Sequence, residues 1–290
     1  MKVLVTGANG NLGSKIVEYL LTKLSVEEII VGVRNDKSEK AQNYKEQGLE
    51  VRVTDFENPE TLITAFTGVD RLFIISTFGD YETIMRQHTN AVKAAKVNDV
   101  KQVIYPSVTR AEESDFFLAG MHRAREIAII ESEIPYVILR NNWYVENELS
   151  AIQGCMTGAP WLTAAGEGKI GWVYRPDLAE AAANVLVAEG HNHENKIYEL
   201  SGENLTQQQF VDTLNEILDK KISLFAVDDS SYEEMLKGAG VPEAHLPMLV
   251  MIQKGIRDGG LESTHTDLDF LLERKATSLK QALVQLLGNS

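Results

Sequence analysis

A length of 290 residues, with 44% hydrophobic and 24% charged residues, is typical of a globular α/β protein with one large domain, or with a main domain and an appended lobe. The net charge of −14 excludes nucleic acid as an expected partner, because its phosphates would be repelled, and it is compatible with a neutral or cationic small molecule. With one cysteine (Cys155), no Cys/His cluster of metal-ligand spacing, no signal peptide and no membrane-spanning segment, we expect a cytoplasmic protein without disulfide, bound metal or membrane contact.

The first feature along the chain is a short apolar strand, Val3 to Thr6, that runs into a glycine-spaced turn and then into an amphipathic helix. Gly7, Gly10 and Gly13 follow the spacing G-x-x-G-x-x-G. Glycines at these places let the chain reverse, let the backbone approach a ligand, and let the helix pack closely on the strand. The N–H groups at the start of the helix would face a pyrophosphate. The stretch therefore predicts a dinucleotide-binding turn.

Strands and helices then alternate as far as residue 140. This alternation predicts a Rossmann-type, doubly wound parallel sheet with helices on both faces, and a ligand at the carboxyl ends of the strands. The further strands are expected at 28–33, 49–54, 71–76, 100–105 and 136–139, and the further helices at 37–47, 59–66, 81–96 and 118–132.

Beyond residue 140 the rhythm changes to an aromatic and glycine-containing stretch. We expect Asp177 to cap a helix over 178–188, a strand from Lys196, and a helix over 207–218 capped by Thr206. Residues 1–140, with return segments from about 175–201, are predicted to form the NAD(P)-binding domain. Residues 141–290 are predicted to form a smaller C-terminal α/β lobe that supplies one wall of the cleft.

Arg34 stands just after the second strand, about twenty residues beyond the glycine turn. An acidic residue at this place would bind the adenosine ribose and repel a 2′-phosphate, whereas an arginine attracts the phosphate. Asn35 and Lys37 add donors, while Asp36 keeps a mixed NAD/NADP preference open. NADPH is therefore the expected cofactor, with NADH as a possible second one.

Four further residues at strand ends are candidates for the cofactor site. Asp55 and Phe56 follow the third strand, where a carboxylate can accept from the adenine amine and a ring can pack on the base; alternatively, Asp55 caps a helix that begins near Pro59. Ser76 and Thr77 end the fourth strand, where backbone groups flank the ribose.

The helix predicted over 118–132 lacks the Tyr-x-x-x-Lys motif that short-chain reductases place after the fifth strand. His122 and Glu126 lie there instead, four residues apart on one face. They can relay a proton or position a substrate, or they form a hydrogen-bonded helix pair. His122 is thus the candidate catalytic residue, and the other five histidines are expected on the surface.

Residues at the end of the sixth strand are expected near the nicotinamide. Asn141 or Asn142 could bind its carboxamide, and aromatic residues could wall a pocket, although large aromatics after a strand are also common in cores. The residues predicted to line a substrate cleft are Phe78, His122, Trp143, Tyr144 and Trp172.

Several segments together resemble the NmrA-like group of atypical short-chain dehydrogenases, with its triphenylmethane reductase and type 2 NAD(P)H:quinone oxidoreductase branches most similar. These segments are TGANGNLG at the start, VRN after the second strand, TDF after the third, AGMHRARE, LRNNWYVEN, RPDLAEAAANVL and KIYELSGENLT. The similarity covers nearly the whole chain.

The resemblance implies NADPH-dependent hydride transfer to quinones or conjugated dyes by a Rossmann domain with a small C-terminal lobe. It implies that Asn9, Gly10, Asn11 and Leu12 hold the pyrophosphate, Arg34 the 2′-phosphate and Asn142 the nicotinamide side. Relatives often carry Thr and another polar residue where this chain has Asn9 and Asn11, and Pro106 in the expected turn after the fifth strand argues against a catalytic Ser107.

The missing tyrosine favours conjugated acceptors, because an isolated ketone or sugar carbonyl needs a positioned acid during reduction. We therefore expect a reductase of small aromatic or quinone-like substrates that is a monomer or a homodimer. Two alternatives remain: an NAD(P)-sensing regulator without turnover, and a sugar-nucleotide epimerase or isoflavone-type reductase.

Overall fold

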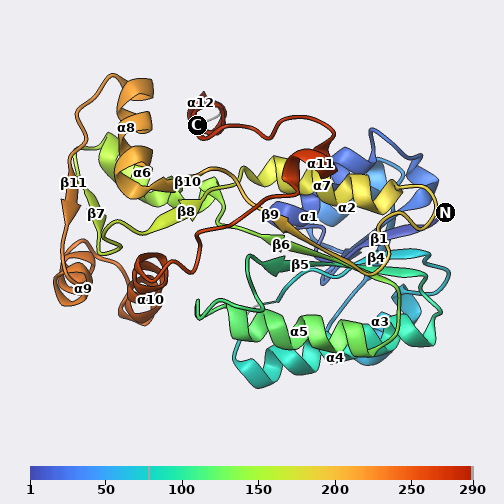
Figure 1. Cartoon of the computed structure of the whole chain (residues 1–290). Coiled ribbons are helices and arrows are strands. Elements are labelled where there is room, and N and C mark those ends of the chain that lie inside the picture. Colours follow the sequence, from blue (N-terminus) through green and yellow to red (C-terminus); the bar gives the residue numbers. More distant parts are fainter. Residues whose placement is uncertain (78, 289–290) are drawn as a thin grey trace.

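The computed structural model describes residues 1–77 and 79–288 of the chain (Figure 1). Phe78, which the sequence predicts at the substrate cleft, lies outside the described residues. The described chain folds into a large layered α/β part and a smaller lobe beside it (Figure 1).

A seven-stranded sheet, with the order β3-β2-β1-β4-β5-β6-β9, forms the centre of the large part. All its neighbouring strands pair in parallel, which confirms the predicted doubly wound fold. The strand order reverses between β1 and β4, so the ligand site of such a sheet is expected above their carboxyl ends. The strands are β1 Val3–Val5, β2 Ile29–Val33, β3 Glu50–Val53, β4 Arg71–Phe73, β5 Gln102–Val108, β6 Tyr136–Asn141 and β9 Lys196–Leu200.

Helices cover both faces of this sheet (Figure 1). Successive residues of a strand point to opposite faces of the sheet, and each face has its own core. Val3 and Val5 face a core shared with α1, α2, α7 and α11, while Leu4 faces a core shared with α3, α4 and α5. The helices of the two layers are α1 Asn11–Leu20, α2 Glu39–Glu46, α7 Arg175–Val187 and α11 Leu268–Leu272, and α3 Pro59–Ala65, α4 Tyr81–Val97 and α5 Ala119–Glu131.

The smaller lobe is built from two two-stranded sheets and the remaining helices around its own aromatic core. In that core, Trp161 and Trp172 pack on Phe210 with ring centroids 5.0 and 4.8 Å away. Strand β8 pairs with β10 antiparallel, and β7 pairs with β11 in parallel. The elements of the lobe are β7 Trp161–Thr163, β8 Lys169–Gly171, β10 Asn204–Thr206, β11 Leu224–Ala226, α6 Leu149–Met156, α8 Gln207–Leu218, α9 Asp229–Gly238, α10 Leu246–Arg257 and α12 Leu279–Gly288, with the 3-10 helices η2 Val145–Glu148 and η3 Glu243–His245. A further 3-10 helix, η1 Val26–Glu28, leads into β2 in the large part.

The chain crosses back to the large part after building the first half of the lobe. Helix α7 packs against α1, and β9 pairs with β6 at the edge of the main sheet. The division of the chain into an NAD(P)-binding domain and a lobe with the predicted boundaries stays a prediction.

Three local expectations are wrong and one is confirmed. The fourth strand, expected over 71–76, ends at Phe73. Asp177 does not cap α7, because Tyr174 is the N-cap and Asp177 lies in the first turn, where it accepts hydrogen bonds from Arg274 and Thr277. The fifth strand does not end before Pro106 but continues through it to Val108. Thr206 caps α8 as predicted.

A proline fits inside β5 because of where its nitrogen points. Ile104 and Pro106 present their backbone groups toward β4, as the bond from Ile74 N–H to Ile104 O shows. Strand β4 ends at Phe73, so no ladder bond is lost at Pro106, and the Ser76 hydroxyl donates to the Pro106 carbonyl instead.

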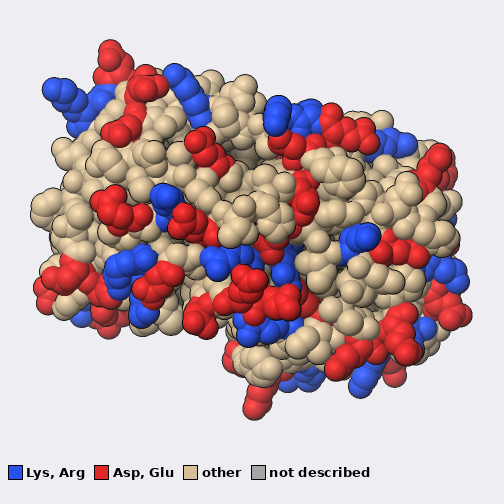
Figure 2. All heavy atoms as spheres, in the orientation of Figure 1, with Lys and Arg blue, Asp and Glu red and all other residues tan. Residues whose placement is uncertain are grey.

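Among the described residues, no helix is both long enough and apolar enough to cross a membrane. Figure 2 shows acidic side chains spread over the visible face with Lys and Arg between them, and no continuous basic patch on that face.

Candidate functional site

The glycine turn has the geometry that a bound pyrophosphate requires. Gly7 adopts φ +60°, where a Cβ would lie 2.6 Å from Ile75 Cγ2, and a Cβ on Gly13 would lie 2.4 Å from Gly7 O. Both positions therefore admit only glycine at this packing distance. Gly10 is exposed and a Cβ there would meet only Gly7 O, at 3.2 Å. The backbone at Gly10 is consequently open to an approaching ligand.

The first turn of α1 offers unused N–H donors at this opening. The N-cap Gly10 has no side chain to cap the helix, and within residues 1–77 and 79–288 no acceptor is found for the N–H groups of Asn11, Leu12 and Gly13. Three free donors at the positive end of a helix form an anion-binding site. This geometry agrees with the predicted role of the turn.

Side chains of α2 and the segment before it hold the turn in place. Lys40 Nζ donates to Asn9 O at 2.9 Å, Asn9 Nδ2 donates to Ser38 Oγ at 3.0 Å, and Tyr44 Oη donates to Ala8 O at 2.8 Å. Asn9 Oδ1 is buried without a partner. The turn is thus preorganised, with one acceptor left for a ligand donor.

Arg34 is exposed directly after β2, and its side chain makes no hydrogen bond or ion pair with the described part of the chain. The nearby Asp36 is engaged, since Lys45 Nζ lies 3.3 Å from its carboxylate. A free guanidinium beside a neutralised carboxylate favours a 2′-phosphate over a ribose hydroxyl.

At the end of β3, Asp55 does not cap the following helix. Its Oδ1 accepts the N–H of Glu57 at 3.0 Å, whereas the N-cap of α3 is Asn58, which accepts from Glu60 N–H at 3.2 Å. Phe56 is half-buried against the core beneath α3 and α4. The adenine role of Asp55 and Phe56 stays a prediction.

His122 belongs to a hydrogen-bonded group that joins β4, β5 and α5. Its Nδ1 lies 3.0 Å from the hydroxyl of Tyr105, which also accepts from Arg125 Nη1 at 3.1 Å. Arg125 Nη2 donates to Thr77 O at 3.0 Å, and Ser76 Oγ lies 3.4 Å from the Tyr105 hydroxyl. Ser76 and Thr77 therefore lie beside His122, at the carboxyl end of β4.

His122 and Glu126 do not form the helix pair that the sequence allowed, since each has other partners. Glu126 is buried and accepts from Arg140 Nη2 at 2.7 Å and from Ser107 Oγ at 2.5 Å. Arg140 also pairs with the buried Glu199 at 3.3 Å. Burial alone would lower the pKa of Arg140, but the two carboxylates outweigh it and raise that pKa above its ordinary value. Ser107 is thereby held in a structural cluster.

The two asparagines at the end of β6 differ in which of their side-chain atoms lack a hydrogen-bond partner. Asn142 Nδ2 donates to Ser201 Oγ and to Leu261 O, both at 3.0 Å, and its Oδ1 accepts from the N–H of Trp143. Asn141 Nδ2 donates to the Tyr144 hydroxyl at 3.2 Å, while its Oδ1 is buried without a partner. Asn141 therefore has one acceptor without a partner, closed to solvent in this structure, whereas the amide of Asn142 is occupied at the junction with the lobe.

The three aromatic residues predicted at the cleft take different places. Trp143 and Trp172 both donate their indole N–H to Glu148 Oε1 at 3.0 Å. Trp172 is buried in the core of the lobe, which does not support its predicted place in the lining of a substrate cleft. Trp143 is half-buried. Tyr144 is half-buried on the opposite side, against the core beneath α1 and α7, with Arg175 stacked over its ring at 5.2 Å.

Tyr105, Arg125 and His88 also belong to the hydrogen-bonded group around His122, and the sequence did not predict them there. His88, expected on the surface, is buried: its Nε2 donates to Arg125 O at 3.1 Å and its ring packs edge-on to Tyr105. One sequence signal could have pointed to Tyr105. It is a polar side chain within an apolar strand, and the helix that follows this strand carries two arginines.

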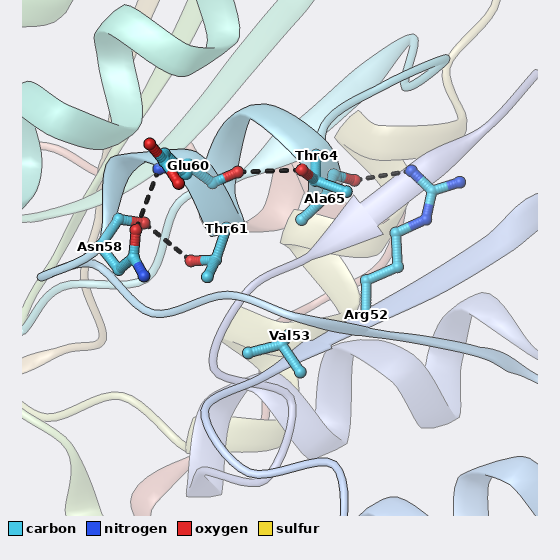
Figure 3. A pocket seen from close by; sticks show the side chains of 7 residues that line it. All are labelled: Arg52, Val53, Asn58, Glu60, Thr61, Thr64 and Ala65. Carbon is cyan, nitrogen blue, oxygen red and sulfur yellow. Dashed lines mark hydrogen bonds between the residues drawn. The ribbon is translucent and has the colours of Figure 1, made fainter.

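An open hollow of about 500 Å³ lies away from this chemistry, between the edge strand β3 and α3 (Figure 3). Its polar side chains are engaged with each other and with the backbone: Asn58 and Glu60 at the start of α3, and Arg52 with Ala65 O at 2.6 Å (Figure 3). It contains no unpaired buried group and is not a candidate for the site. Within residues 1–77 and 79–288, no group of three or more metal-ligating side chains is found.

Two known enzymes are similar to this chain over nearly its whole length. Quinone oxidoreductase 2 of Escherichia coli K12 is 33% identical over 285 residues, covering 98% of both chains, and its structure with NADPH superimposes with a TM-score of 0.91. Triphenylmethane reductase of Citrobacter sp. is 38% identical, with coverage of 99% of this chain and 100% of that one and a TM-score of 0.91. It has also been solved with NADP(H), at 36% identity.

The NmrA-like family pattern matches residues 1–281. The segments on which the resemblance rests, the free helix N-terminus and the whole-length similarity to two NADPH-dependent or dye-reducing enzymes all agree. The chain belongs to the NmrA-like family.

Proposed function

We propose that this protein is an NADPH-dependent reductase that transfers hydride to a quinone-like or conjugated aromatic acceptor. The observation that carries the proposal is the turn Gly7 to Gly13, with an open backbone at Gly10 and three unused N–H groups at the start of α1. Such a group of donors binds a pyrophosphate.

The residues present fit a dinucleotide, each through a group that is free in the protein. The N–H groups of Asn11, Leu12 and Gly13 would bind the pyrophosphate, Arg34 the 2′-phosphate, and Asn141 Oδ1 the carboxamide. The reduced nicotinamide, when bound, supplies a hydride. NADH would use the same turn but would leave Arg34 without its ligand.

The acceptor class is supported by chemistry and by the relatives. The Tyr-x-x-x-Lys pair is replaced by His122 and Glu126, and Glu126 is committed to Arg140. A site without that acid and its lysine suits an acceptor that takes hydride into a delocalised system. The relatives in E. coli and Citrobacter are a quinone reductase and a triphenylmethane dye reductase, which fits this class.

The test is the oxidation of NADPH, followed by its absorbance, with a panel of small quinones and cationic aromatic dyes. Steady turnover is expected with at least one member. Tight NADPH binding in calorimetry without turnover of any acceptor would instead support a cofactor-sensing regulator. Turnover confined to sugar nucleotides or isoflavone-type substrates would replace the proposed acceptor class. Sedimentation of the same sample separates the monomer from the homodimer.

A further inference from the structure

The buried tyrosine beside His122 has a hydroxyl whose hydrogen can be placed by counting donors. Tyr105 is fully buried in β5, and its hydroxyl lies near Arg125 Nη1 at 3.1 Å, His122 Nδ1 at 3.0 Å and Ser76 Oγ at 3.4 Å. Arginine can only donate, so Arg125 uses one lone pair of the Tyr105 oxygen. The single hydrogen of Ser76 goes to Pro106 O at 2.9 Å.

The hydrogen of Tyr105 is left for His122, since the contact with His122 Nδ1 is the shorter of the two that remain. A ring nitrogen that accepts a hydrogen bond carries no hydrogen, so the neutral imidazole of His122 has its N–H at Nε2. Within the described residues, Nε2 has no hydrogen-bond partner, and it is not among the sealed buried atoms. The half-buried ring therefore presents an N–H to the space at the carboxyl ends of β4 and β5.

We propose that Tyr105 is a positioning residue that fixes His122 with its Nε2–H directed at the acceptor, where it donates a hydrogen bond to the oxygen that becomes negative when a quinone is reduced. This inference rests on the proposed reductase function. His122 is the catalytic residue, and Tyr105, held by Arg125, sets its tautomer.

The surroundings of His122 keep it neutral. Burial lowers the pKa of His122 to about 3, and the positive charge of Arg125 acts in the same direction. A neutral imidazole can stabilise an oxyanion as a hydrogen-bond donor without giving up its proton, which leaves water to protonate the product. A triarylmethyl cation takes hydride at carbon and has no such oxygen, so it gains nothing from His122.

Two acceptors therefore separate the role of His122 from general damage to the site. With para-benzoquinone, Tyr105→Phe and His122→Ala should each lower kcat by about 10- to 100-fold. This is less than the roughly 100- to 1,000-fold typical of oxyanion donors, because the charge on a reduced quinone is delocalised. With crystal violet, a triarylmethyl cation, both variants should keep kcat within about twofold. His122→Gln, which keeps an amide N–H near the position of Nε2, should recover part of the quinone activity.

The chain offers a matched control at the edge of the sheet, where the Tyr198 hydroxyl lies 2.8 Å from His193 Nδ1. Tyr198→Phe removes the same kind of bond and should leave both activities unchanged. Equal losses with both acceptors, or no loss with the quinone, would overturn the inference while leaving the reductase function in place.

Nitrogen NMR of His122 tests the tautomer without any turnover. The parent should show Nδ1 without a hydrogen and Nε2 with one from pH 5 to 9, a span that lies well above its pKa of about 3, and Tyr105→Phe should allow the Nδ1–H form. A parent with its hydrogen on Nδ1 would overturn the inference even if Tyr105→Phe does not fold. A parent that oxidises NADPH with neither acceptor contradicts the proposed function, and the tautomer still reports on Tyr105.

Discussion

Arg34 is the residue on which we expect cofactor choice to depend. Its guanidinium is free, and charge-assisted bonds to a phosphate contribute on the order of 1.5–3 kcal/mol each. Arg34→Ala should therefore weaken NADPH by roughly 10- to 100-fold, at about 1.4 kcal/mol per decade, and leave NADH nearly unaffected. Dissociation constants for both cofactors in parent and variant measure the effect.

A control for this measurement is Arg257→Ala, which removes an arginine paired with Asp229 in the smaller lobe. It should leave both dissociation constants unchanged. Equal weakening of both cofactors in Arg34→Ala would mean that Arg34 only shapes the loop, and a parent that prefers NADH would contradict the assignment of NADPH.

Gly10 and Gly13 should respond differently to a side chain. Gly10→Val puts methyl groups where the pyrophosphate approaches, but a Cβ there meets only Gly7 O at 3.2 Å, so NADPH binding should be lost while the melting temperature is kept. Gly13→Ala forces a Cβ to 2.4 Å from Gly7 O and should lower both. Calorimetry and thermal unfolding of the two variants provide the comparison. Near-normal NADPH affinity in Gly10→Val would mean that the turn does not bind the pyrophosphate.

At the scale of elements, the buried ion pairs of Arg140 connect β5, β6, β9 and α5. Glu126 and Glu199 both bind Arg140, Ser107 donates to Glu126, and Thr109 Oγ1 donates to Glu199 at 2.8 Å. In Glu126→Ala the charge of Arg140 stays paired with Glu199, but the buried N–H groups of Arg140 and the hydroxyl of Ser107 lose the carboxylate that accepts their hydrogen bonds. The variant should therefore lower the free energy of unfolding by roughly 1–3 kcal/mol.

Urea unfolding tests this expectation. Lys169→Ala, which breaks the exposed pair with Glu262, serves as the control and should leave the midpoint nearly unchanged. If Glu126→Ala unfolds at the parent midpoint, the cluster does not stabilise the contact between these strands and α5.

For the whole molecule, buried neutral histidine predicts sensitivity to acid. Burial, followed by the charge of Arg125, lowers the pKa of His88 from 6.5 to about 3 in the folded chain. Between these values the unfolded chain binds the proton more tightly, so the contribution of His88 is complete above pH 6.5 and is lost as the pH falls. At pH 5, about 1.5 pH units below 6.5, the loss is roughly 2 kcal/mol.

His88→Gln keeps a donor for Arg125 O but cannot titrate. Its free energy of unfolding, measured in urea at pH 7 and pH 5, should fall by about 2 kcal/mol less than that of the parent. The same fall in both proteins would show that His88 does not contribute to acid sensitivity.

Local sequence patterns predict most of the fold. The glycine turn, the alternation of strands and helices and the cap at Thr206 each depend on residues within a few positions of one another, and the structure confirms the doubly wound sheet and that cap. The end of the fifth strand was predicted wrongly at Pro106. A proline is tolerated inside β5 because the neighbouring strand β4 has already ended, and the sequence around Pro106 does not contain that information.

The sequence predicts candidate site residues that stand at a fixed distance from a strand end, and it does not predict which side chains meet across the fold. Gly10 and Arg34 follow from their distance to a strand end, whereas the Tyr105–His122 bond joins residues 17 apart and the Arg140–Glu199 bond joins residues 59 apart. Whether Asn141 or Asn142 has a free amide likewise depends on Leu261, more than a hundred residues away. Hydrogen bonds of a buried polar group are set by whichever strands and helices pack around it, so these partners emerge only once the sheet and the lobe are assembled.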